Sequence, residues 1–466
     1  MGADGAAVQD VLDPATGEAI ARVPLSTASQ VDAAARAAHA AWDEWADTPV
    51  MERARTMFRV QALLERDFEE LSQTVVRENG KALDEARGEV RRGIDVVEFA
   101  AGMPTLMLGG ALEQVSRGVD TELFHHPLGV VAAITPFNFP VMVPLWTAPI
   151  AIAAGNTYIL KPSPRTPLSA LRLAELFEEA GVPAGVFSVV HGGEEAVNAI
   201  CDHELIRAVS FVGSAPVAKA VYARAAAAGK RVQALAGAKN HIVVMPDADL
   251  DVAAPGMFSS AFANAGQRCL AGAVGVAVGD IADELAGRLA TLARESRVGP
   301  GLDPESTITP VTSAAARQRI ARYIELGERE GAEILVDGRR EDGDGFFLGP
   351  TILDRVSPDM RVAREEIFGP VLALERLGSL DEALEAIAAS EFGNASAIFT
   401  RSGAVARAFR RRVTAGMVGI NVPVPASMAF FPFAGWKGSF YGDLHATGMD
   451  GVRFFTETKV VTSRWP

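Results

Sequence analysis

Apolar residues recur every three or four positions through the first part of the chain, which is the spacing of an amphipathic helix. Two such stretches cover residues 31–45 and 52–79. Thr27 and Gln30 stand at the spacing of a capping box ahead of the first stretch, so the sequence predicts a helix that begins there. The second stretch predicts a helix over its whole length.

The pattern changes at Pro127, after which short apolar runs alternate with amphipathic stretches. The short runs predict β-strands at residues 129–135, 157–160, 186–190, 208–212 and 241–245. The stretches between them predict helices at residues 167–180, with Pro167 at the first helical position, and at 194–201 and 216–228. This alternation is typical of a parallel sheet with helices on both faces, so the predicted fold class is α/β. Further α/β structure is expected over residues 250–439, and an extended arm over 459–462.

Length and charge limit the possible functions. The chain has 466 residues, so two or three domains are expected. Hydrophobic residues make up 49% and charged residues 22%, which is an ordinary globular balance. The formal net charge of −14 argues against binding to nucleic acid through phosphate neutralisation. The single basic run, Arg410 to Arg412, is expected on a solvated helix face.

Several absences bear on compartment and cofactors. Residues 1–10 have neither the basic start nor the apolar run of a signal peptide. The longest apolar stretch, residues 141–155, is interrupted by Pro144 and Pro149 and is too short to span a bilayer, so no membrane association is expected. Cys201 and Cys269 are the only cysteines, which favours a reducing cytoplasm. The seven histidines have no metal-ligand spacing, so no metal site is expected.

Cys269, at the end of the run Asn264-Ala-Gly-Gln-Arg-Cys269, is the candidate nucleophile. A cysteine among small residues is commonly buried filler, and a thiol with a pKa of roughly 8.5 needs a base or a helix N-terminus to react fast. Asn138 lies in the rigid loop Thr135-Pro-Phe-Asn-Phe-Pro140. It is either a turn residue or the amide donor of an oxyanion hole.

Two further positions suit a nucleotide. Lys161 follows a predicted strand, and a cation at the carboxyl edge of a parallel sheet is where a ribose or phosphate binds. Gly213 and Ser214 separate a predicted strand from a helix, which is the place for a pyrophosphate. No Gly-x-Gly-x-x-Gly occurs, so a dinucleotide site here departs from the usual fingerprint.

Five segments in order resemble the successive signature motifs of aldehyde dehydrogenases: Thr135–Pro140, Leu160-Lys-Pro-Ser163, Phe211-Val-Gly-Ser214, Gly266–Cys269 and Glu365-Glu-Ile-Phe-Gly-Pro370. The similarity extends from Asp13-Pro-Ala-Thr-Gly17 to Lys459, and the strand that family members usually carry ahead of Asp13 is expected to be missing. The resemblance implies the aldehyde dehydrogenase fold. Its parts would be a five-stranded variant Rossmann NAD-binding domain (1–108 and 128–236), an α/β catalytic domain (237–443) and an oligomerisation ribbon (109–127 and 444–466), in a homodimer or homotetramer.

The resemblance also implies roles. Cys269 is similar to the family's nucleophile, and Asn138 with the Cys269 backbone N–H is similar to its oxyanion hole. The implied cofactor is NAD. The implied contacts are Lys161 on the adenosine ribose, Ser214 on the pyrophosphate, Glu366 on the nicotinamide ribose and Phe368 beside the nicotinamide, with Phe137, Ser163, Pro164 and Gly213 around them. Pro164 stands where many members carry a glutamate that repels a 2′-phosphate, so NADP is not excluded.

One departure narrows the chemistry. Hydrolytic members have a glutamate where this chain has Leu235, and a second family glutamate is missing near Ala446 or Thr447. Leucine cannot accept a proton, so water loses its general base and a thiol becomes the better nucleophile toward the thioester. The subgroup that releases its thioester to coenzyme A is the methylmalonate and malonate semialdehyde dehydrogenases, which this sequence resembles in detail. For such substrates the subgroup implies loss of carbon dioxide and an acetyl-CoA or propionyl-CoA product.

Two arginines carry over from that subgroup as ligands of the substrate carboxylate. They are Arg92, which is otherwise a surface salt-bridge residue, and Arg268, next to the nucleophile. A guanidinium pairs with a carboxylate through two hydrogen bonds. Two alternatives remain open at this point: a hydrolytic dehydrogenase of another acid semialdehyde with an unrecognised base, and a non-catalytic member of the fold.

Overall fold

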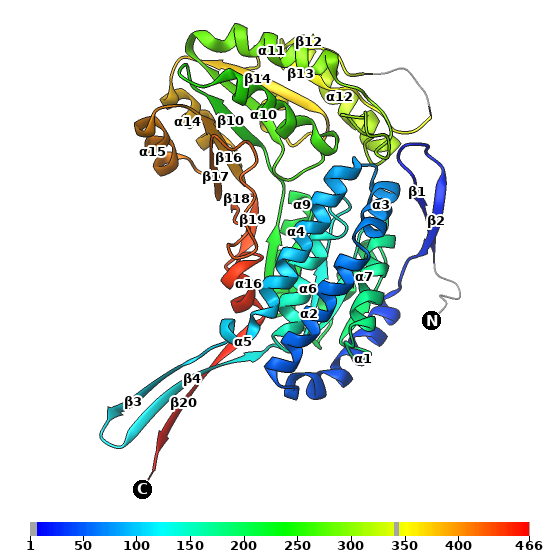
Figure 1. The fold of residues 1–466 in the computed structure, drawn as a ribbon, viewed down its shortest axis with the longest axis vertical. Coiled ribbons are helices and arrows are strands. Elements are labelled where there is room, and N and C mark those ends of the chain that lie inside the picture. Colours follow the sequence, from blue (N-terminus) through cyan, green and yellow to red (C-terminus); the bar gives the residue numbers. More distant parts are fainter. Residues whose placement is uncertain (1–6, 340–343, 466) are drawn as a thin grey trace.

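The computed structural model describes residues 7–339 and 344–465 (Figure 1). A six-stranded sheet in the order β19-β9-β8-β5-β6-β7 forms the centre of the lower part in this view. Five of its strands are parallel, and β19 joins β9 in the antiparallel direction. The strands are β5 (Val130–Ile134), β6 (Thr157–Lys161), β7 (Phe187–Val189), β8 (Ile206–Val212), β9 (Arg231–Leu235) and β19 (Phe440–Gly442).

Helices cover both faces of this sheet, which explains the continuous apolar runs of its strands. In β5 successive residues point to opposite faces: Val130 and Ala132 pack into one apolar cluster, and Val131 and Ala133 into another. The first cluster includes residues of α1 (Ala28–Asp47), α8 (Glu194–Asp202) and α9 (Ala215–Ala227). The second includes residues of α2 (Val50–Arg66), α3 (Phe68–Asn79), α4 (Leu83–Ala101), α6 (Met142–Ala153) and α7 (Leu168–Glu179).

A second, seven-stranded sheet lies above the first in Figure 1, in the order β12-β13-β14-β11-β10-β16-β17. All its pairs are parallel except β12 with β13. The strands are β10 (Asn240–Val244), β11 (Gly272–Val278), β12 (Glu333–Val336), β13 (Thr351–Asp354), β14 (Val371–Leu377), β16 (Ala395–Phe399) and β17 (Met417–Ile420). The longer helices here are α10 (Leu250–Phe262), α11 (Ala282–Glu295), α12 (Ala314–Glu330), α14 (Leu380–Ala389) and α15 (Gly403–Arg412).

A three-stranded antiparallel ribbon projects from the body and carries the C-terminal end (Figure 1). It consists of β3 (Gly110–Ser116), β4 (Val119–Pro127) and β20 (Thr456–Arg464), so the predicted extended arm is confirmed. The remaining short elements are β1 (Val8–Leu12), β2 (Ala19–Pro24), α5 (Met103–Leu106), η1 (Ala263–Gly266), η2 (Gly279–Ile281), α13 (Arg361–Arg364), β15 (Phe392–Gly393), β18 (Trp436–Lys437) and α16 (Gly448–Phe454).

The predicted α/β class and the strand–helix alternation are confirmed, but three local predictions were wrong. The helix predicted over residues 52–79 is two helices that meet at Asp67, whose carboxylate pairs with Arg66 and with Arg172 of α7. The spacing of apolar residues does not reveal these charge contacts, so the break at Asp67 could not be predicted from it. Pro167 precedes α7 instead of opening it, and the Glu78 carboxylate accepts from the first amides of the helix, at Leu168 and Ser169.

The third error concerns the start of the chain, where a strand does precede Asp13. The strand is β1, which pairs with β2 through a turn that Gly17 completes at φ +76°. Only one of its five residues, Val11, is buried, so the sequence carries no apolar alternation there. The apolar stretch at residues 141–155 forms the fully buried α6. Across the described residues, no helix is both long and apolar enough to cross a membrane.

Candidate active site

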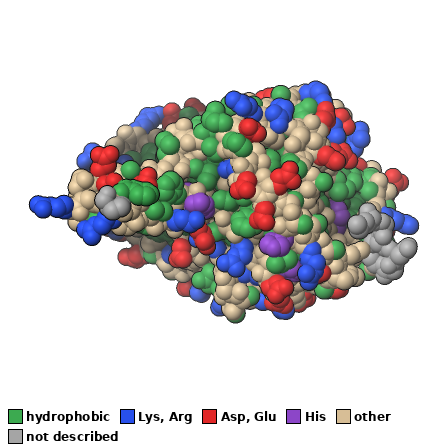
Figure 2. Space-filling model, turned by 90° about the horizontal axis from the view of Figure 1, so that it is seen from below, with side chains coloured by type: hydrophobic (Ala, Val, Ile, Leu, Met, Phe, Trp, Pro, Cys, Tyr) green, Lys and Arg blue, Asp and Glu red, His purple; other side chains and the backbone are tan. Residues whose placement is uncertain are grey.

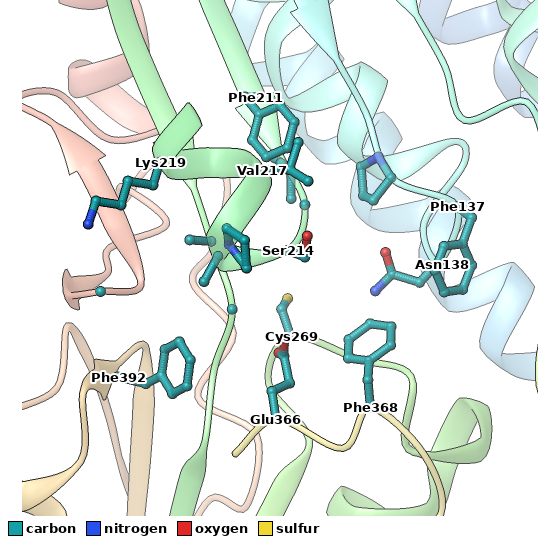
Figure 3. A pocket seen from close by; sticks show the side chains of 18 of the residues that line it. Phe137, Asn138, Phe211, Ser214, Val217, Lys219, Cys269, Glu366, Phe368 and Phe392 are labelled. Carbon is teal, nitrogen blue, oxygen red and sulfur yellow. The ribbon is translucent and has the colours of Figure 1, made fainter. Parts of the chain in front are cut away.

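Cys269 lines two cavities that meet at its side chain. The larger, of about 1510 Å³, runs along the carboxyl edge of the first sheet and holds all ten predicted nucleophile, oxyanion and cofactor positions (Figure 3). The smaller, of about 330 Å³, lies under α4 and holds Arg92 and Arg268. The fold therefore gathers every residue singled out in the sequence around one thiol.

The backbone before Cys269 has an unusual shape. Asn264, Ala265 and Gly266 are consecutive left-handed residues, with φ of 50°, 51° and 68°. At Gly266 a Cβ atom would lie 2.1 Å from the Gly369 carbonyl oxygen, so only glycine fits there. Strain of this kind persists only where the surroundings hold it, and it commonly occurs at functional sites.

Two side-chain amides fix the other side of Cys269. Its carbonyl oxygen accepts from Asn240 Nδ2 and from Asn394 Nδ2, each at 2.8 Å. Asn240 Nδ2 also donates to the Ala271 carbonyl at 2.9 Å. The nucleophile is thus held by amides at the starts of β10 and β16, and no motif in the sequence indicated either residue.

The surroundings of Cys269 favour the neutral thiol over the thiolate. Burial, followed by the nearby Glu366 carboxylate, raises the pKa of the thiol to about 12, although Arg268 opposes the shift. No long helix begins at Cys269 to lower the pKa. Deprotonation must therefore accompany the reaction.

Asn138 is buried, and its Nδ2 donates to the Gln267 carbonyl at 2.9 Å. The backbone carbonyl of Asn138 accepts from Lys81 Nζ at 2.7 Å, and Lys81 forms a buried ion pair with Glu89 at 2.5 Å. These two charged side chains are 1% and 2% exposed, and sequence reasoning missed both because nothing marks them as facing inward.

Glu89 completes this clamp from the other side. Its Oε1 accepts from the Val141 and Met142 amides, at 2.8 and 3.1 Å, just as α6 begins. The loop that carries Asn138 is therefore held at the carbonyl of Asn138 and at the start of the helix that follows. This rigidity is what an oxyanion donor requires.

Glu366 and Phe368 approach the same cavity from the second sheet (Figure 3). Glu366 Oε1 accepts from the Ala238 amide at 2.8 Å, and burial raises the pKa of this carboxyl above its usual range. Phe368 has a left-handed backbone, φ 53°, and its ring meets Phe137 edge-on at 5.9 Å. A flat cofactor ring could pack against this aromatic pair.

The opposite end of the large cavity has the features of a nucleotide site. Lys161 Nζ donates to the Pro162 and Gly192 carbonyls at 2.9 Å each, and burial lowers the pKa of this lysine to about 8. Ser163 and Pro164 line the wall beside it. Gly213 and Ser214 lead into α9, and the start of this helix lines the cavity, where a helix N-terminus favours an anion.

Arg92 and Arg268 both line the small cavity, but they differ in burial and in hydrogen bonding. Arg268 Nη2 donates to the Ser259 and Ser260 carbonyls at 2.9 Å, while its Nε is buried without a partner in the described residues. Burial lowers the pKa of this guanidinium. Arg92 is an exposed residue of α4, so the surface salt bridge considered for it is not what the structure records.

The positions of the two missing glutamates offer no base. Leu235 ends β9 and is 5% exposed, and Ala446 is 1% exposed; both belong to the apolar cluster against which Cys269 packs. Thr447 Oγ1 donates to the Phe431 and Ala446 carbonyls. The side of the thiol where hydrolytic enzymes hold water is therefore apolar.

Comparison with known proteins agrees with this geometry. The model of the aldehyde dehydrogenase family matches residues 2–461. Malonate-semialdehyde dehydrogenase 1 of Geobacillus kaustophilus is 56% identical, over 100% of this chain and 96% of the relative, and that of Geobacillus thermodenitrificans is 54% identical, over 99% and 96%. The crystal structure of methylmalonate-semialdehyde dehydrogenase from Oceanimonas doudoroffii superimposes with a TM-score of 0.98 at 46% identity, covering 99% of this chain and 96% of the other.

A second solved structure, a Sinorhizobium meliloti protein complexed with NAD, has a TM-score of 0.98 at 44% identity, covering 100% of this chain and 96% of the other. The fold and the family match define an NAD-dependent aldehyde dehydrogenase. The chain belongs to the aldehyde dehydrogenase family.

Alkylation of Cys269 in the protein without cofactor tests the state of the thiol. A thiolate fraction below its pKa rises tenfold per pH unit, so the rate of carbamidomethylation by iodoacetamide should keep rising to about pH 9 or beyond. Mass spectrometry of the Cys269 peptide gives the rate, and Cys201, which is fully buried, serves as the unreactive reference. A plateau below about pH 8 would mean that the thiolate is already formed.

The double variant Lys81→Met/Glu89→Gln tests the clamp on Asn138. Removing both charges avoids an unpaired buried ion, while the bond to the Asn138 carbonyl is lost. We expect kcat to fall roughly tenfold to a hundredfold, because small misplacements of catalytic groups have effects of that size. Glu98→Gln, at an exposed position of the same helix, is the control. A change below threefold in folded protein would contradict the positioning role.

Proposed function

We propose that this protein oxidises malonate semialdehyde or methylmalonate semialdehyde with NAD and transfers the acyl group to coenzyme A. The observation that carries the proposal is a cysteine nucleophile between two cavities with no carboxylate at the positions of Leu235 and Ala446. The names of the relatives support the substrate class.

NAD fits the large cavity. At about 1510 Å³ it exceeds the roughly 300–1,000 Å³ of ordinary ligand pockets, and it combines a helix N-terminus, a buried lysine and an aromatic pair. We propose that Lys161 and Ser163 hold the adenosine ribose, Gly213 and Ser214 the pyrophosphate, and Glu366 with Phe137 and Phe368 the nicotinamide riboside. The bound nicotinamide supplies the hydride acceptor. Pro164 has no carboxylate to repel a 2′-phosphate, so NADP remains a second candidate cofactor.

The residues of the chain perform the other steps. Cys269 Sγ adds to the aldehyde carbon, while Asn138 Nδ2 and the Cys269 N–H stabilise the oxyanion by roughly 3–4 kcal/mol per donor. After oxidation a thioester remains on Cys269. The thiol of coenzyme A then attacks this thioester and displaces Cys269 from the acyl group. Water does not compete, because the apolar surroundings of Leu235 give it no general base.

Arg92 and Arg268 are proposed to bind the substrate carboxylate in the small cavity. Arg268 lines this cavity, and a buried guanidinium with an unsatisfied N–H is costly without an anionic partner nearby, which supports this role. Malonic-type thioesters carry that carboxylate on the carbon next to the carbonyl, so we further propose that carbon dioxide is lost before transfer. The product is then acetyl-CoA or propionyl-CoA.

We also propose the assembly and the domain limits. Residues 1–108 and 128–236 form the cofactor domain, residues 237–443 form the catalytic domain, and the ribbon (109–127 and 444–466) joins copies into a homodimer or homotetramer. The strand β19, although within 237–443, adds to the sheet of the cofactor domain. The ribbon exposes Leu112, Phe124 and Val460, and Figure 2 shows hydrophobic side chains on the projecting part of the molecule. Both cysteines are free thiols, which fits a reducing cytoplasm.

Coenzyme A dependence is the main test. Without coenzyme A, enzyme, NAD and malonate semialdehyde should give a burst of NADH close to one per active site and then slow turnover. Adding coenzyme A should restore fast turnover with an acyl-CoA product. Leu235→Glu should raise the rate without coenzyme A, because a carboxylate there could activate water. Fast wild-type turnover that releases free acid without the thiol would instead support a hydrolytic enzyme.

Substrate choice tests the arginines. Arg268→Leu should lose roughly 2–5 kcal/mol of kcat/KM for malonate semialdehyde, as when one partner of a buried charge pair is removed. Arg92→Leu should lose less, because Arg92 is exposed and its pairing is screened by water. Propanal, which has no carboxylate, should be affected far less. Arg91→Leu, on the same helix but paired with Glu65, is the matched control. Equal losses for both aldehydes would exclude a carboxylate clamp.

A further inference from the structure

The proposed transfer to coenzyme A leaves one proton without an acceptor. The attacking thiol must lose its proton, and the Cys269 sulfur that departs must regain one. Leu235 and Ala446 cannot handle either proton. A group already in the site must therefore do so.

Three carboxylates line the small cavity: Glu85, Glu89 and Asp95. Asp95 does not line the large cavity that Glu366 shares with Cys269, and the other two are engaged in holding the backbone. Glu85 accepts from the Ala82 and Asn264 amides, and Glu89 is bound by Lys81 and by two amides of α6. Each of these groups holds the backbone in place.

Glu366 lines the same cavity as Cys269, and only one of its two carboxylate oxygens is hydrogen-bonded within the described chain. Its Oε1 is anchored by the Ala238 amide at 2.8 Å, and Oε2 has no hydrogen-bond partner among the described residues. Oε2 lies against Gly237, where a Cβ atom would come within 2.9 Å of it, so the missing side chain leaves that oxygen room beside the cavity wall. Figure 3 shows the Glu366 side chain and the Cys269 sulfur in the same part of the cavity.

The charged neighbours of Glu366 suit a base. Lys239 and Arg319 both favour its ionised form, against the burial that opposes it. Lys239 Nζ is buried and has no hydrogen-bond partner in the described part of the chain, and its charge favours the ionised carboxylate of Glu366. A general base works best when its pKa approaches the working pH, and burial moves the Glu366 carboxyl in that direction.

We propose that Glu366 is the general base of the transfer to coenzyme A, in addition to its proposed contact with the nicotinamide ribose. This role rests on the proposed function. Glu366 takes the proton of the coenzyme A thiol as the sulfur attacks the thioester carbon. The bond from that carbon to Cys269 Sγ then breaks, and the proton passes from Glu366 to the departing sulfur, which restores the Cys269 thiol and the Glu366 carboxylate.

The test isolates this half of the reaction from the cofactor. Cys269 is acetylated with p-nitrophenyl acetate in the absence of NAD, excess reagent is removed, and the acetyl-enzyme is mixed with a thiol. Two acceptors are compared: coenzyme A, whose thiol is protonated at neutral pH, and thiophenol, which is largely ionised and needs no base. Because no nucleotide is present, loss of a ribose contact cannot affect either rate.

Glu366→Gln should slow acetyl transfer to coenzyme A by roughly a hundredfold or more, the usual contribution of a general base. Transfer to thiophenol should change less than threefold. Glu365→Gln is the matched control, because that neighbouring carboxylate is already bound by Arg361 and the Tyr323 hydroxyl. Equal transfer of wild-type and Glu366→Gln acetyl-enzyme to coenzyme A would overturn the base assignment, and so would equal slowing with both thiols. A wild-type acetyl-enzyme that hydrolyses and ignores coenzyme A would instead overturn the proposed function itself.

Discussion

The buried ion pair between Lys81 and Glu89 holds the catalytic face of this molecule together. Lys81 lies just before α4 and binds the carbonyl of Asn138, while Glu89 lies within α4 and binds the amides that open α6. Two charges removed from water would be unfavourable alone, and breaking such a pair by removing one partner destabilises by about 3–5 kcal/mol. Here every contact is directed at the loop that carries the oxyanion donor. The main effect of the ion pair is therefore to fix the position of this loop.

A second constraint is the protonated nucleophile. The surroundings that position Cys269 are apolar and close to a carboxylate, so they raise the pKa of the thiol instead of lowering it. A resting thiol of this kind is protected from unselective alkylation and oxidation, since the thiolate is the reactive form. The same apolar surroundings exclude the water base of hydrolytic enzymes. The apolar surroundings of Cys269 thus account both for its low reactivity at rest and for the preference for coenzyme A over water.

The large cavity is lined by residues from both sheets. Nucleotide-binding positions follow the strands of the first sheet, as expected at the carboxyl edge of parallel strands. Glu366 and Phe368 reach across from the second sheet, and the left-handed backbone of Phe368 turns them into the cavity. The reacting centre therefore exists only where the two parts meet. Lys239 and Glu375 are both buried without hydrogen-bond partners in the described residues, and the charge of Lys239 favours the ionised forms of both Glu375 and Glu366.

The sequence by itself determined the α/β class, the alternation of strands and helices that begins at Pro127, and the motifs that carry Cys269, Asn138, Lys161 and Glu366. Apolar periodicity and residue types are local properties, and the chain order of the motifs is read directly. Tertiary structure alone decided the rest. The break at Asp67, the clamp of Lys81 and Glu89 on the Asn138 loop, and the amides of Asn240 and Asn394 on Cys269 all depend on polar contacts with residues distant along the chain. A polar residue looks the same in sequence whether it faces water or a buried partner, and only packing determines which of the two it meets.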